Sequence, residues 1–256
     1  MRNMPVNHPN TQQNTWACYA AKALTESDPS VNFGSFDTDS NGKLSVSELQ
    51  VIFLIAGGES ATGLNSPGGV WAMATSMLCD LNGDGIFEDI SGEHGITLDN
   101  VRMLGINSPT YGQNGYSQFG ERHGLSEDIS WDATIGVIAH ELGHAYFDLP
   151  DLYDTTNISS GIGAFGVMGG GAWGYKALTE YSGATPVHFN AWSKEKLGVC
   201  SPQTVSSGED NYTLPAVHQM IDNSSSCGIY KATTSNSDEY FLFENRSTGG
   251  YDEGLN

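Results

Sequence analysis

Hydrophobic and polar positions in the N-terminal part of the chain predict a helix followed by a strand. Residues 15–26 (WACYAAKALTES) carry large or apolar side chains at spacings of three and four, which is typical of one face of a helix. The members of this face are Trp16, Tyr19, Ala20 and Ala23. Residues 51–57 (VIFLIAG) form an unbroken apolar run that ends at glycine, which favours a fully buried central strand. We expect a second helix around residues 71–78.

The clearest helix lies in the middle of the chain. In residues 130–147 (SWDATIGVIAHELGHAYF), either Ser130 or Asp132 can cap the first turn. The apolar positions that share one face of this helix are Ile135, Ile138, Leu142 and Tyr146. Because this face supplies the core, the polar residues on the opposite face need another explanation.

The remaining segments alternate between turns and short elements. Residues 80–116 are dense in Gly, Asn, Asp and Pro, which predicts loops and short strands. Residues 187–197 predict a helix that ends at Gly198, and residues 229–234 and 239–246 predict strands. Since no internal repeat or long linker interrupts this pattern, we expect a mixed α/β fold in which all 256 residues form a single loop-rich domain.

Composition excludes several classes of protein. Of the 256 residues 38% are hydrophobic, which suffices for a core, and no run of about 18 apolar residues predicts a membrane span. The first ten residues lack the basic and apolar stretches of a signal peptide, so we expect any export signal to lie outside this sequence. Only 10 Lys and Arg stand against 30 Asp and Glu, for a net charge of −20. Such a surface repels phosphate backbones, which argues against partners such as nucleic acids or anionic membranes.

The four cysteines favour an oxidising compartment. Cys18, Cys79, Cys200 and Cys227 include no CxxC pair, which argues against a zinc ribbon or a thioredoxin-like centre. We expect two disulfides, with Cys200 and Cys227 closing a polar loop and Cys18 paired with Cys79, although three connectivities are possible. This interpretation indicates an extracellular protein, and buried free thiols are the alternative.

Residues 140–144 (HELGH) form an HExxH motif inside the central helix. Two histidines four residues apart project from one face, so His140 and His144 can bind the same zinc ion. Glu141 is not a ligand: about 100° round the helix, its carboxylate can take a proton from zinc-bound water and pass it to the leaving amine. Such a motif arises rarely by chance, so an ordinary pair of surface histidines is the weaker interpretation.

We expect the third zinc ligand shortly after the helix. No Glu occurs between Glu141 and Glu180, which argues against a thermolysin-like Glu ligand some 20 residues further on. Pro150 must end the helix by Leu149, and the chain then turns back with acidic side chains that can reach the metal. The acidic residues of this turn are Asp148, Asp151 and Asp154.

A family resemblance is carried by three segments, residues 140–156 (HELGHAYFDLPDLYDTT), 165–174 (FGVMGGGAWG) and 186–198 (PVHFNAWSKEKLG). Together they resemble the immune inhibitor A family of secreted bacterial metallopeptidases, a metzincin-like group, and the resemblance covers most of the chain from about residue 28 onward. It implies a metzincin-like α/β protease domain with a mixed sheet. The site residues that it implies are His140, His144 and Asp151 as zinc ligands, Glu141 as the general base, and Met168 in a Met-turn under the metal.

The chain departs from the usual metzincin pattern at the turn after the helix. That pattern has glycine three residues after the second histidine, where this chain has Phe147. Pro150 occupies the expected ligand position, and Asp151 falls one residue late. A one-residue insertion accommodates the difference but leaves Asp148 open as a rival ligand. For Met168, an ordinary buried methionine in a glycine-rich turn is the alternative.

Residues 37–48 (DTDSNGKLSVSE) fit the EF-hand calcium loop at every specified position. The predicted calcium ligands are the side chains of Asp37, Asp39, Asn41 and Glu48 and the carbonyl of Lys43. The flanking segments do not predict helices, because Gly34 interrupts the incoming one and an apolar strand follows the loop. We therefore expect a structural calcium loop rather than a sensor, and a metal-free turn is the alternative.

A second calcium loop is expected at residues 80–89 (DLNGDGIFED), with a weaker pattern because Ser91 stands where the bidentate Glu should lie. The candidate ligands are Asp80, Asn82 and Asp84, with Glu88 or Asp89, and a plain turn is the alternative. Both loops would stiffen segments that are too polar to pack and would limit self-cleavage.

The sequence as a whole predicts a secreted zinc endopeptidase that acts on proteins or peptides. A calcium-stabilised binding or adhesion module with the same fold but little turnover is the second hypothesis, and a calcium buffer or sensor is the third. Tyr175 and His188 are candidates for contact with the transition-state oxyanion. Family members generally carry an apolar strand before the region matching residue 28 and another after residues 251–256. Neither is evident here, so we leave open whether the domain is complete or a fragment.

Overall fold

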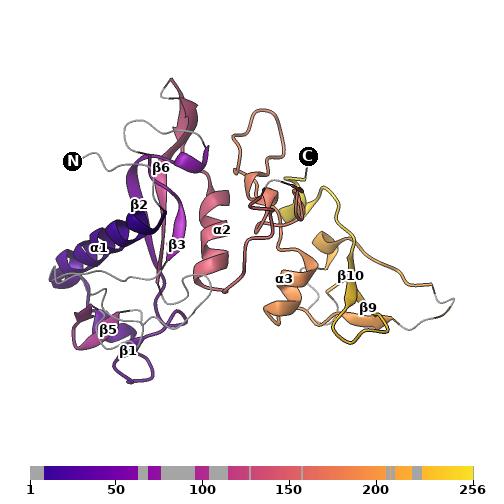
Figure 1. Cartoon of the computed structure of the whole chain (residues 1–256), viewed down its shortest axis with the longest axis horizontal. Helices are drawn as coiled ribbons and strands as arrows, with labels where there is room; N and C mark the ends of the chain where they lie inside the picture. Colours follow the sequence, from indigo (N-terminus) through magenta and orange to yellow (C-terminus); the bar gives the residue numbers. More distant parts are fainter. Residues whose placement is uncertain are drawn as a thin grey trace. The chain divides into compact units, whose positions relative to one another are not determined.

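The fold is described from a computed structural model of the chain (Figure 1). The structure describes residues 9–62, 69–75, 96–103, 115–126, 128–156, 158–205, 208, 211–220 and 227–255. Its residues group into two compact units: Met1–Ala133 with Glu141–Pro150, and Thr134–His140 with Asp151–Asn256. The division falls inside helix α2 (Ile135–Ala145), and each unit is described by itself.

Helix α1 (Pro9–Ser27) confirms the predicted N-terminal helix but buries a different face. The residues that it buries are Ala17, Ala20, Ala21 and Leu24, whereas Tyr19 is 51% exposed and Ala23 is exposed. Small side chains let the helix backbone approach the sheet closely, and the tyrosine is too large for that contact. Its ring instead meets Trp16 edge-on, with centroids 6.2 Å apart.

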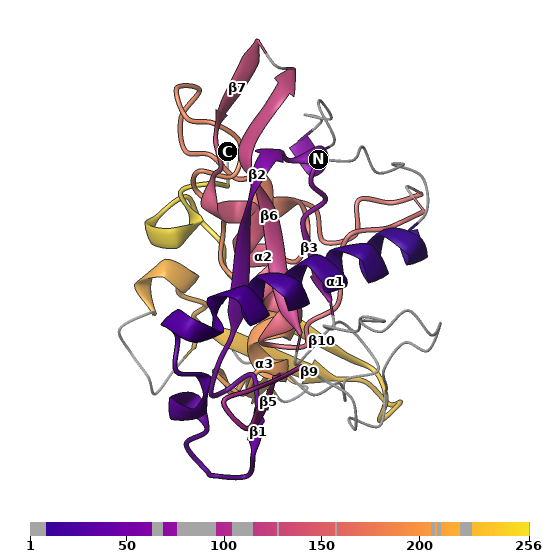
Figure 2. The same cartoon turned by 90° about the vertical axis from the view of Figure 1, so that its left-hand side faces the viewer.

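The main sheet of the first unit has the order β2-β6-β3, with β7 paired to the far part of β6. Its strands are β2 (Val51–Gly58), β3 (Met73–Thr75), β6 (Tyr116–Ser126) and β7 (Ile129–Asp132). The strand β2 runs parallel to β6, and β3 and β7 run antiparallel to it. Figure 2 shows α1 crossing in front of β2 and β6.

Two predictions for this sheet are wrong. The strand β2 is not buried on both faces: its residues alternate, and Ile52 and Leu54 are 45% and 62% exposed. Among the described strands it pairs only with β6. Val51 and Phe53 pack against the core to which α1 contributes, and the residues between them point to the other face. The helix expected at residues 71–78 is also wrong where it is described, because residues 73–75 form β3.

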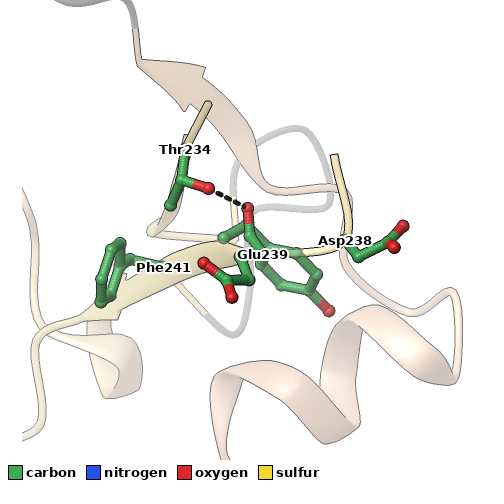
Figure 3. A pocket seen from close by; sticks show the side chains of 5 residues that line it. Thr234, Asp238, Glu239 and Phe241 are labelled. Atoms are coloured by element: carbon green, nitrogen blue, oxygen red, sulfur yellow. Dashed lines mark hydrogen bonds between the residues drawn. The ribbon is translucent and has the colours of Figure 1, made fainter. Parts of the chain in front are cut away.

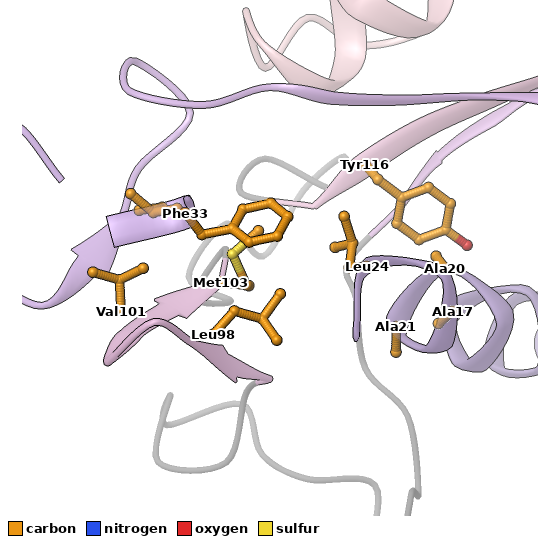
Figure 4. Close-up of a cluster of buried hydrophobic side chains, with 10 residues drawn as sticks. Ala17, Ala20, Ala21, Leu24, Phe33, Leu98, Val101, Met103 and Tyr116 are labelled. Atoms are coloured by element: carbon orange, nitrogen blue, oxygen red, sulfur yellow. The ribbon is translucent and has the colours of Figure 1, made fainter. Parts of the chain in front are cut away.

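The core of the first unit lies between α1 and a second, smaller sheet (Figure 4). This sheet has the order β1-β5-β4 and consists of β1 (Lys43–Leu44), β4 (Thr97–Leu98) and β5 (Val101–Met103). The short 3₁₀ helices of this unit are η1 (Asp28–Ser30), η2 (Phe33–Phe36) and η3 (Ser60–Thr62). Phe33, Met103 and Tyr116 meet Leu24 in one cluster, which ties the calcium-like loop region to the main sheet.

The predicted central helix exists as α2, but its start and its buried face differ from the prediction. Ser130 and Asp132 lie in β7, where both side chains bond the guanidinium of Arg122, so neither caps the helix. Ile135 and Tyr146 are 61% and 42% exposed. The residues that α2 buries are Gly136, Val137, Glu141, Gly143, His144 and Ala145. The polar motif is therefore turned inward rather than away from the core.

The second unit confirms the elements predicted near the C-terminus. Its elements are η4 (Gly170–Trp173), α3 (Ala191–Lys196), β8 (Gln203–Val205), η5 (Val217–Gln219), β9 (Ile229–Thr233), β10 (Tyr240–Glu244) and η6 (Gly250–Asp252). Asn190 caps α3 by accepting a hydrogen bond from the Ser193 amide, and Gly198 follows the helix with a φ of 68°. The sheet has the order β10-β9-β8.

The predicted disulfide between Cys200 and Cys227 is confirmed. It joins the segment after α3 to the start of β9, beside a small core of Ala191 and Ile229. Cys18 is also disulfide-bonded, and Cys79, its predicted partner, lies outside the described residues. The chain thus has a mixed α/β fold, as predicted. Within the described ranges, no helix is both long and apolar enough to cross a membrane.

Candidate metal centre

Helix α2 and the turn that follows it bring two histidines and one aspartate together. One ligand atom each from His140, His144 and Asp151 lies within 4.8 Å of the others. The histidines are one helical turn apart, and Pro150 helps to end the helix so that the chain can double back. Asp151, rather than the rival Asp148, belongs to this group.

Backbone carbonyls orient both imidazole rings. Nδ1 of His140 lies 2.9 Å from the backbone oxygen of Val167, and Nδ1 of His144 lies 2.6 Å from that of Leu149. A carbonyl oxygen can only accept, so each Nδ1 carries the proton and donates it. Each Nε2 is thereby left unprotonated and could bind a metal, which is the arrangement found in histidines that ligate metals.

The donor set fits zinc. Nε2 of His140 lies 3.0 Å from Oδ1 of Asp151, so two atoms that prefer to accept face each other and need a proton or a cation between them. Tetrahedral zinc with bonds of about 2.0–2.1 Å holds its ligand atoms roughly 3.3 Å apart, close to this separation. Two imidazoles and one carboxylate, with room for a further ligand, are typical of catalytic zinc.

The turn between the helix and Asp151 is held by its own backbone. Asp148 has a φ of 52°, in the left-handed region, and its amide donates to the His144 carbonyl at 3.0 Å. Leu149 is fully buried and its amide donates to the Gly143 carbonyl. These backbone bonds and the left-handed residue hold the turn in which Asp151 comes close to the two histidines.

Asp154 has a different role from Asp151. Its carboxylate accepts hydrogen bonds from the Thr156 amide and hydroxyl and from the amides of Ile158 and Ser159. The bonds from Thr156 lead the interactions that hold the pKa of Asp154 below its usual range. Asp154 therefore organises the loop after the turn and is not one of the three clustered ligand groups.

Met168 lies in a turn that packs closely on the same segment. It is 1% exposed, and its carbonyl accepts a hydrogen bond from the Leu152 amide at 2.8 Å. Gly136, in the first turn of α2, approaches the next stretch so closely that a Cβ would lie 1.8 Å from the Ala172 oxygen. The absence of a side chain at Gly136 permits this backbone contact.

Glu141 lies beside the ligands, on the helix between them. Its side chain is largely buried, at 8% exposure for the residue, and its carbonyl accepts a 3.4 Å hydrogen bond from the Ser117 hydroxyl of β6. Ser117 points to the face of β6 opposite Tyr116, whose ring packs in the core under α1. The sheet thereby supports the part of α2 that carries the candidate base.

The two oxyanion candidates differ in their surroundings. Tyr175 follows η4 and is 36% exposed. The ring of His188 meets Tyr251 edge-on at 5.3 Å, and its amide donates to the Asp252 carboxylate. Burial is the largest cause that lowers the pKa of His188. A third aromatic residue that the sequence did not single out, Tyr153, stacks on the His140 ring with centroids 6.0 Å apart.

The first calcium-like loop brings its predicted carboxylates together. Ligand atoms of Asp37, Asp39 and Glu48 lie within 4.8 Å of one another. The Asn41 amide donates to both aspartates, the Lys43 amide donates to the Asn41 side chain, and Gly42 has a φ of 75°. The loop follows a 3₁₀ helix and precedes β2, so it lacks the flanking helices of a sensor, as expected.

Glu48 is hydrogen-bonded by the loop even without a metal. Its Oε2 accepts from the Ser45 amide and hydroxyl, and its Oε1 accepts from the Thr38 amide and hydroxyl. These bonds, those from Ser45 first, lower the pKa of Glu48 to about 2. The carboxylate is thus ionised and aimed at the loop. The second predicted loop, with Asp80, Asn82, Asp84, Glu88 and Asp89, lies outside the described residues.

A separate pocket lies at the turn between β9 and β10 (Figure 3). It has a volume of about 380 Å³ and is lined by Thr234, Asp238, Glu239, Tyr240 and Phe241. The Thr234 hydroxyl bonds the Glu239 carbonyl and so closes the turn. Its lining contains no histidine.

The residues that sequence reasoning missed act through their backbone. Val167 and Leu149 orient the histidines with carbonyl oxygens, which every residue type carries, so no sequence signal could reveal them. Only the position of Val167 next to Met168 hinted at the site. Tyr153 could have been found from the same LPDLYD segment that supplies Asp151.

Comparison with known families finds one match to part of the chain. Residues 126–200 match the family model described as the immune inhibitor A peptidase M6 catalytic domain. The matched segment includes α2, Asp151 and Met168, and it confirms the resemblance inferred from the three motifs over a shorter stretch than residue 28 onward. No curated protein matches the chain.

Proposed function

Because residues 126–200 match the family model of the immune inhibitor A catalytic domain, we propose that this chain is a zinc-dependent endopeptidase of that family. The observation that carries this proposal is the cluster of His140, His144 and Asp151 next to Glu141, with both Nδ1 atoms tied to carbonyls. The metal would be held by Nε2 of the histidines and by the aspartate carboxylate. We propose Met168 as the Met-turn residue of a metzincin-like site.

The chain's own residues have distinct tasks in hydrolysis. Bound zinc supplies a Lewis acid that polarises the scissile carbonyl and acidifies water. Glu141 accepts the proton of the attacking water and later delivers it to the nitrogen of the leaving amine. Its partial burial keeps competing solvent away from this proton transfer. Val167 and Leu149 prevent the histidines from turning, so the carboxylate and the ligands keep their relative positions.

The alternative of a binding or adhesion module without turnover is less well supported. It would explain the fold and a bound metal, but it leaves Glu141 without a task, and the matched family model is that of a catalytic domain. Protein or peptide substrates follow from a peptidase. We also propose that all 256 residues belong to one catalytic domain, since the two units share α2.

Removal and return of the metal test the proposal. Dialysis against a strong chelator should abolish casein cleavage, and stoichiometric zinc should restore it. Metal content is measured at each step by elemental analysis, and intact folding is checked by circular dichroism. Full cleavage by protein shown to be free of zinc and other divalent metals would contradict the proposal.

We also propose that residues 37–48 bind calcium as a structural ion. The support is the group of three carboxylates and the fit of the loop to the EF-hand pattern. Calcium would then protect this loop from proteolysis. Limited proteolysis with and without calcium should show protection in the unaltered chain and a loss of it in Glu48→Gln. Equal cleavage of both proteins in calcium would contradict this role.

We propose secretion as the location of the protein. The disulfide between Cys200 and Cys227 fits an extracellular protein, because such bonds persist in oxidising compartments. Antibody detection in the culture medium of the producing cells tests this, and confinement to the cell interior would contradict it.

A further inference from the structure

Four buried charges cluster in the second unit. The side chain of Arg246 is only 5% exposed and lies between those of Glu244 and Asp252, which are 12% and 0% exposed. Its Nε donates to Asp252 Oδ2 at 2.6 Å, and Nη1 donates to Glu244 Oε1 at 3.1 Å. Lys194 completes the cluster with a 3.0 Å ion pair to Glu244 Oε2. Two of the chain's ten Lys and Arg are thus placed here, where two positive and two negative groups balance.

Arg246 also binds backbone oxygens outside the charge cluster. Its Nη1 donates to the Phe165 carbonyl at 2.8 Å, and its Nη2 lies 3.4 Å from the His188 carbonyl. A guanidinium carries five donors in a rigid plane, so it can hold carboxylates and carbonyls at the same time. The ammonium of Lys194 instead contacts Glu244. In the chain of hydrogen bonds, Glu244 and Arg246 therefore separate Lys194 from the Phe165 carbonyl.

The segment 165–168 connects Arg246 with the candidate zinc ligands. Two residues after the carbonyl that Arg246 holds, the Val167 carbonyl orients the His140 ring. The next carbonyl, that of Met168, holds the amide of Leu152, which directly follows the aspartate ligand. All of these residues belong to the second unit, so the connection lies within one compact body.

We propose that Arg246 is a positioning residue for the zinc centre. By holding the Phe165 carbonyl it fixes the segment 165–168, and with that segment the orientation of His140 and the turn that carries Asp151. This inference rests on the proposed function, because it takes zinc as the metal. Arg246 acts through the segment, so its effect belongs in metal affinity as well as in activity.

The matched pair Arg246→Lys and Lys194→Gln tests this. Arg246→Lys keeps a positive charge among the carboxylates but removes the fork that reaches Phe165. We expect the zinc dissociation constant, measured by competition with a chromophoric chelator, to rise about 10-fold. Lys194→Gln disturbs the same cluster without touching the segment 165–168. It should lower the thermal midpoint while the zinc dissociation constant stays within about 2-fold of the unaltered chain.

Equal zinc affinity in Arg246→Lys and the unaltered chain, or equal weakening in both variants, would overturn the inference. Should Arg246→Lys not fold, Asp252→Asn provides the milder change, because it keeps Arg246 but loosens the carboxylate that orients it. It should weaken zinc binding by a smaller factor, and unchanged affinity would count against the proposal. Failure of the unaltered chain to bind zinc would instead overturn the proposed function, and this inference with it.

Discussion

At the scale of single residues, the candidate centre depends on hydrogen bonds that orient ligands. His140 and His144 each donate from Nδ1 to a carbonyl, and these bonds choose the tautomer that presents Nε2. Asp148 has a backbone in the left-handed region and lies outside the group of three clustered ligand atoms. The choice of the third ligand is therefore a question that single substitutions can answer.

Asp151→Asn and Asp148→Asn are matched changes, because asparagine keeps the size of the side chain and tolerates the left-handed region. We expect Asp151→Asn to weaken zinc binding at least about 100-fold, since it removes a charged ligand, whereas Asp148→Asn should retain zinc. Zinc content after gel filtration checks both, and an anomalous-scattering map at the zinc edge identifies the bound carboxylate. The reverse order of affinities would make Asp148 the ligand.

The sequence predicted the individual side chains of the candidate centre better than it predicted the backbone contacts around them. HExxH and the acidic turn named the side chains that the structure gathers, because ligand chemistry depends on residue type and spacing. The carbonyls of Val167 and Leu149 and the role of Arg246 were not predictable, since they depend on which backbone atoms the fold brings near.

At the scale of elements, α2 carries the candidate histidine ligands and Glu141, and its packing fixes its position. Gly136 gives the helix a close backbone contact with Ala172, and the Gly136 amide donates to the Gly183 carbonyl at 3.0 Å. The contact lies one turn before His140. A side chain at position 136 should therefore disturb the site without touching a ligand.

Gly136→Ala should destabilise the protein by about 1–3 kcal/mol, because the added Cβ would overlap the Ala172 oxygen and force the backbone apart. Ile135→Ala serves as the control, since Ile135 is exposed and its truncation should cost little. Urea unfolding monitored by tryptophan fluorescence measures both. A Gly136→Ala variant as stable as the unaltered chain would show that the helix can move away freely.

The apolar periodicity of the sequence predicted the positions of helices and strands better than it predicted which of their faces is buried. Helix α1 and strands β9 and β10 exist where they were predicted, although α1 buries a different face from the one that its spacing indicated. The apolar run of β2 was taken for a strand buried on both faces, yet Ile52 and Leu54 are exposed. Which face is buried depends on the partner element, and a single sequence does not specify that partner.

At the scale of the whole molecule, buried ionisable groups connect stability to pH. His123 lies in β6 with no exposed surface, and burial lowers its pKa to about 4. An unfolded histidine has a pKa of about 6.5, so acid protonates the unfolded chain first. The contribution of the neutral side chain to stability is present above about pH 6.5 and is lost as the pH falls through 4.

We expect the unaltered chain to lose up to about 3 kcal/mol through His123 between about pH 6.5 and pH 4. His123→Gln should be less stable at pH 7 but should show a flatter fall with acid, because it cannot bind this proton. Chemical denaturation at several pH values in this window measures both slopes, and the carboxylates that titrate in both proteins cancel in the difference. Identical slopes would contradict this role of His123.

For the whole molecule we propose a peptidase whose candidate metal ligands and candidate general base lie on one helix and the turn that follows it. The match over residues 126–200 supports the peptidase, and the geometry of the described residues supports zinc. Both place the same demand on Glu141, which should be needed for catalysis but not for metal binding.

The most direct test is casein cleavage by the unaltered chain and by Glu141→Ala, with zinc content measured in both. We predict equal, stoichiometric zinc and a loss of cleavage in the variant of at least about 100-fold, because general acid–base catalysis typically contributes 100-fold or more. Cleavage by Glu141→Ala at the rate of the unaltered chain, with the same zinc content, would contradict the account.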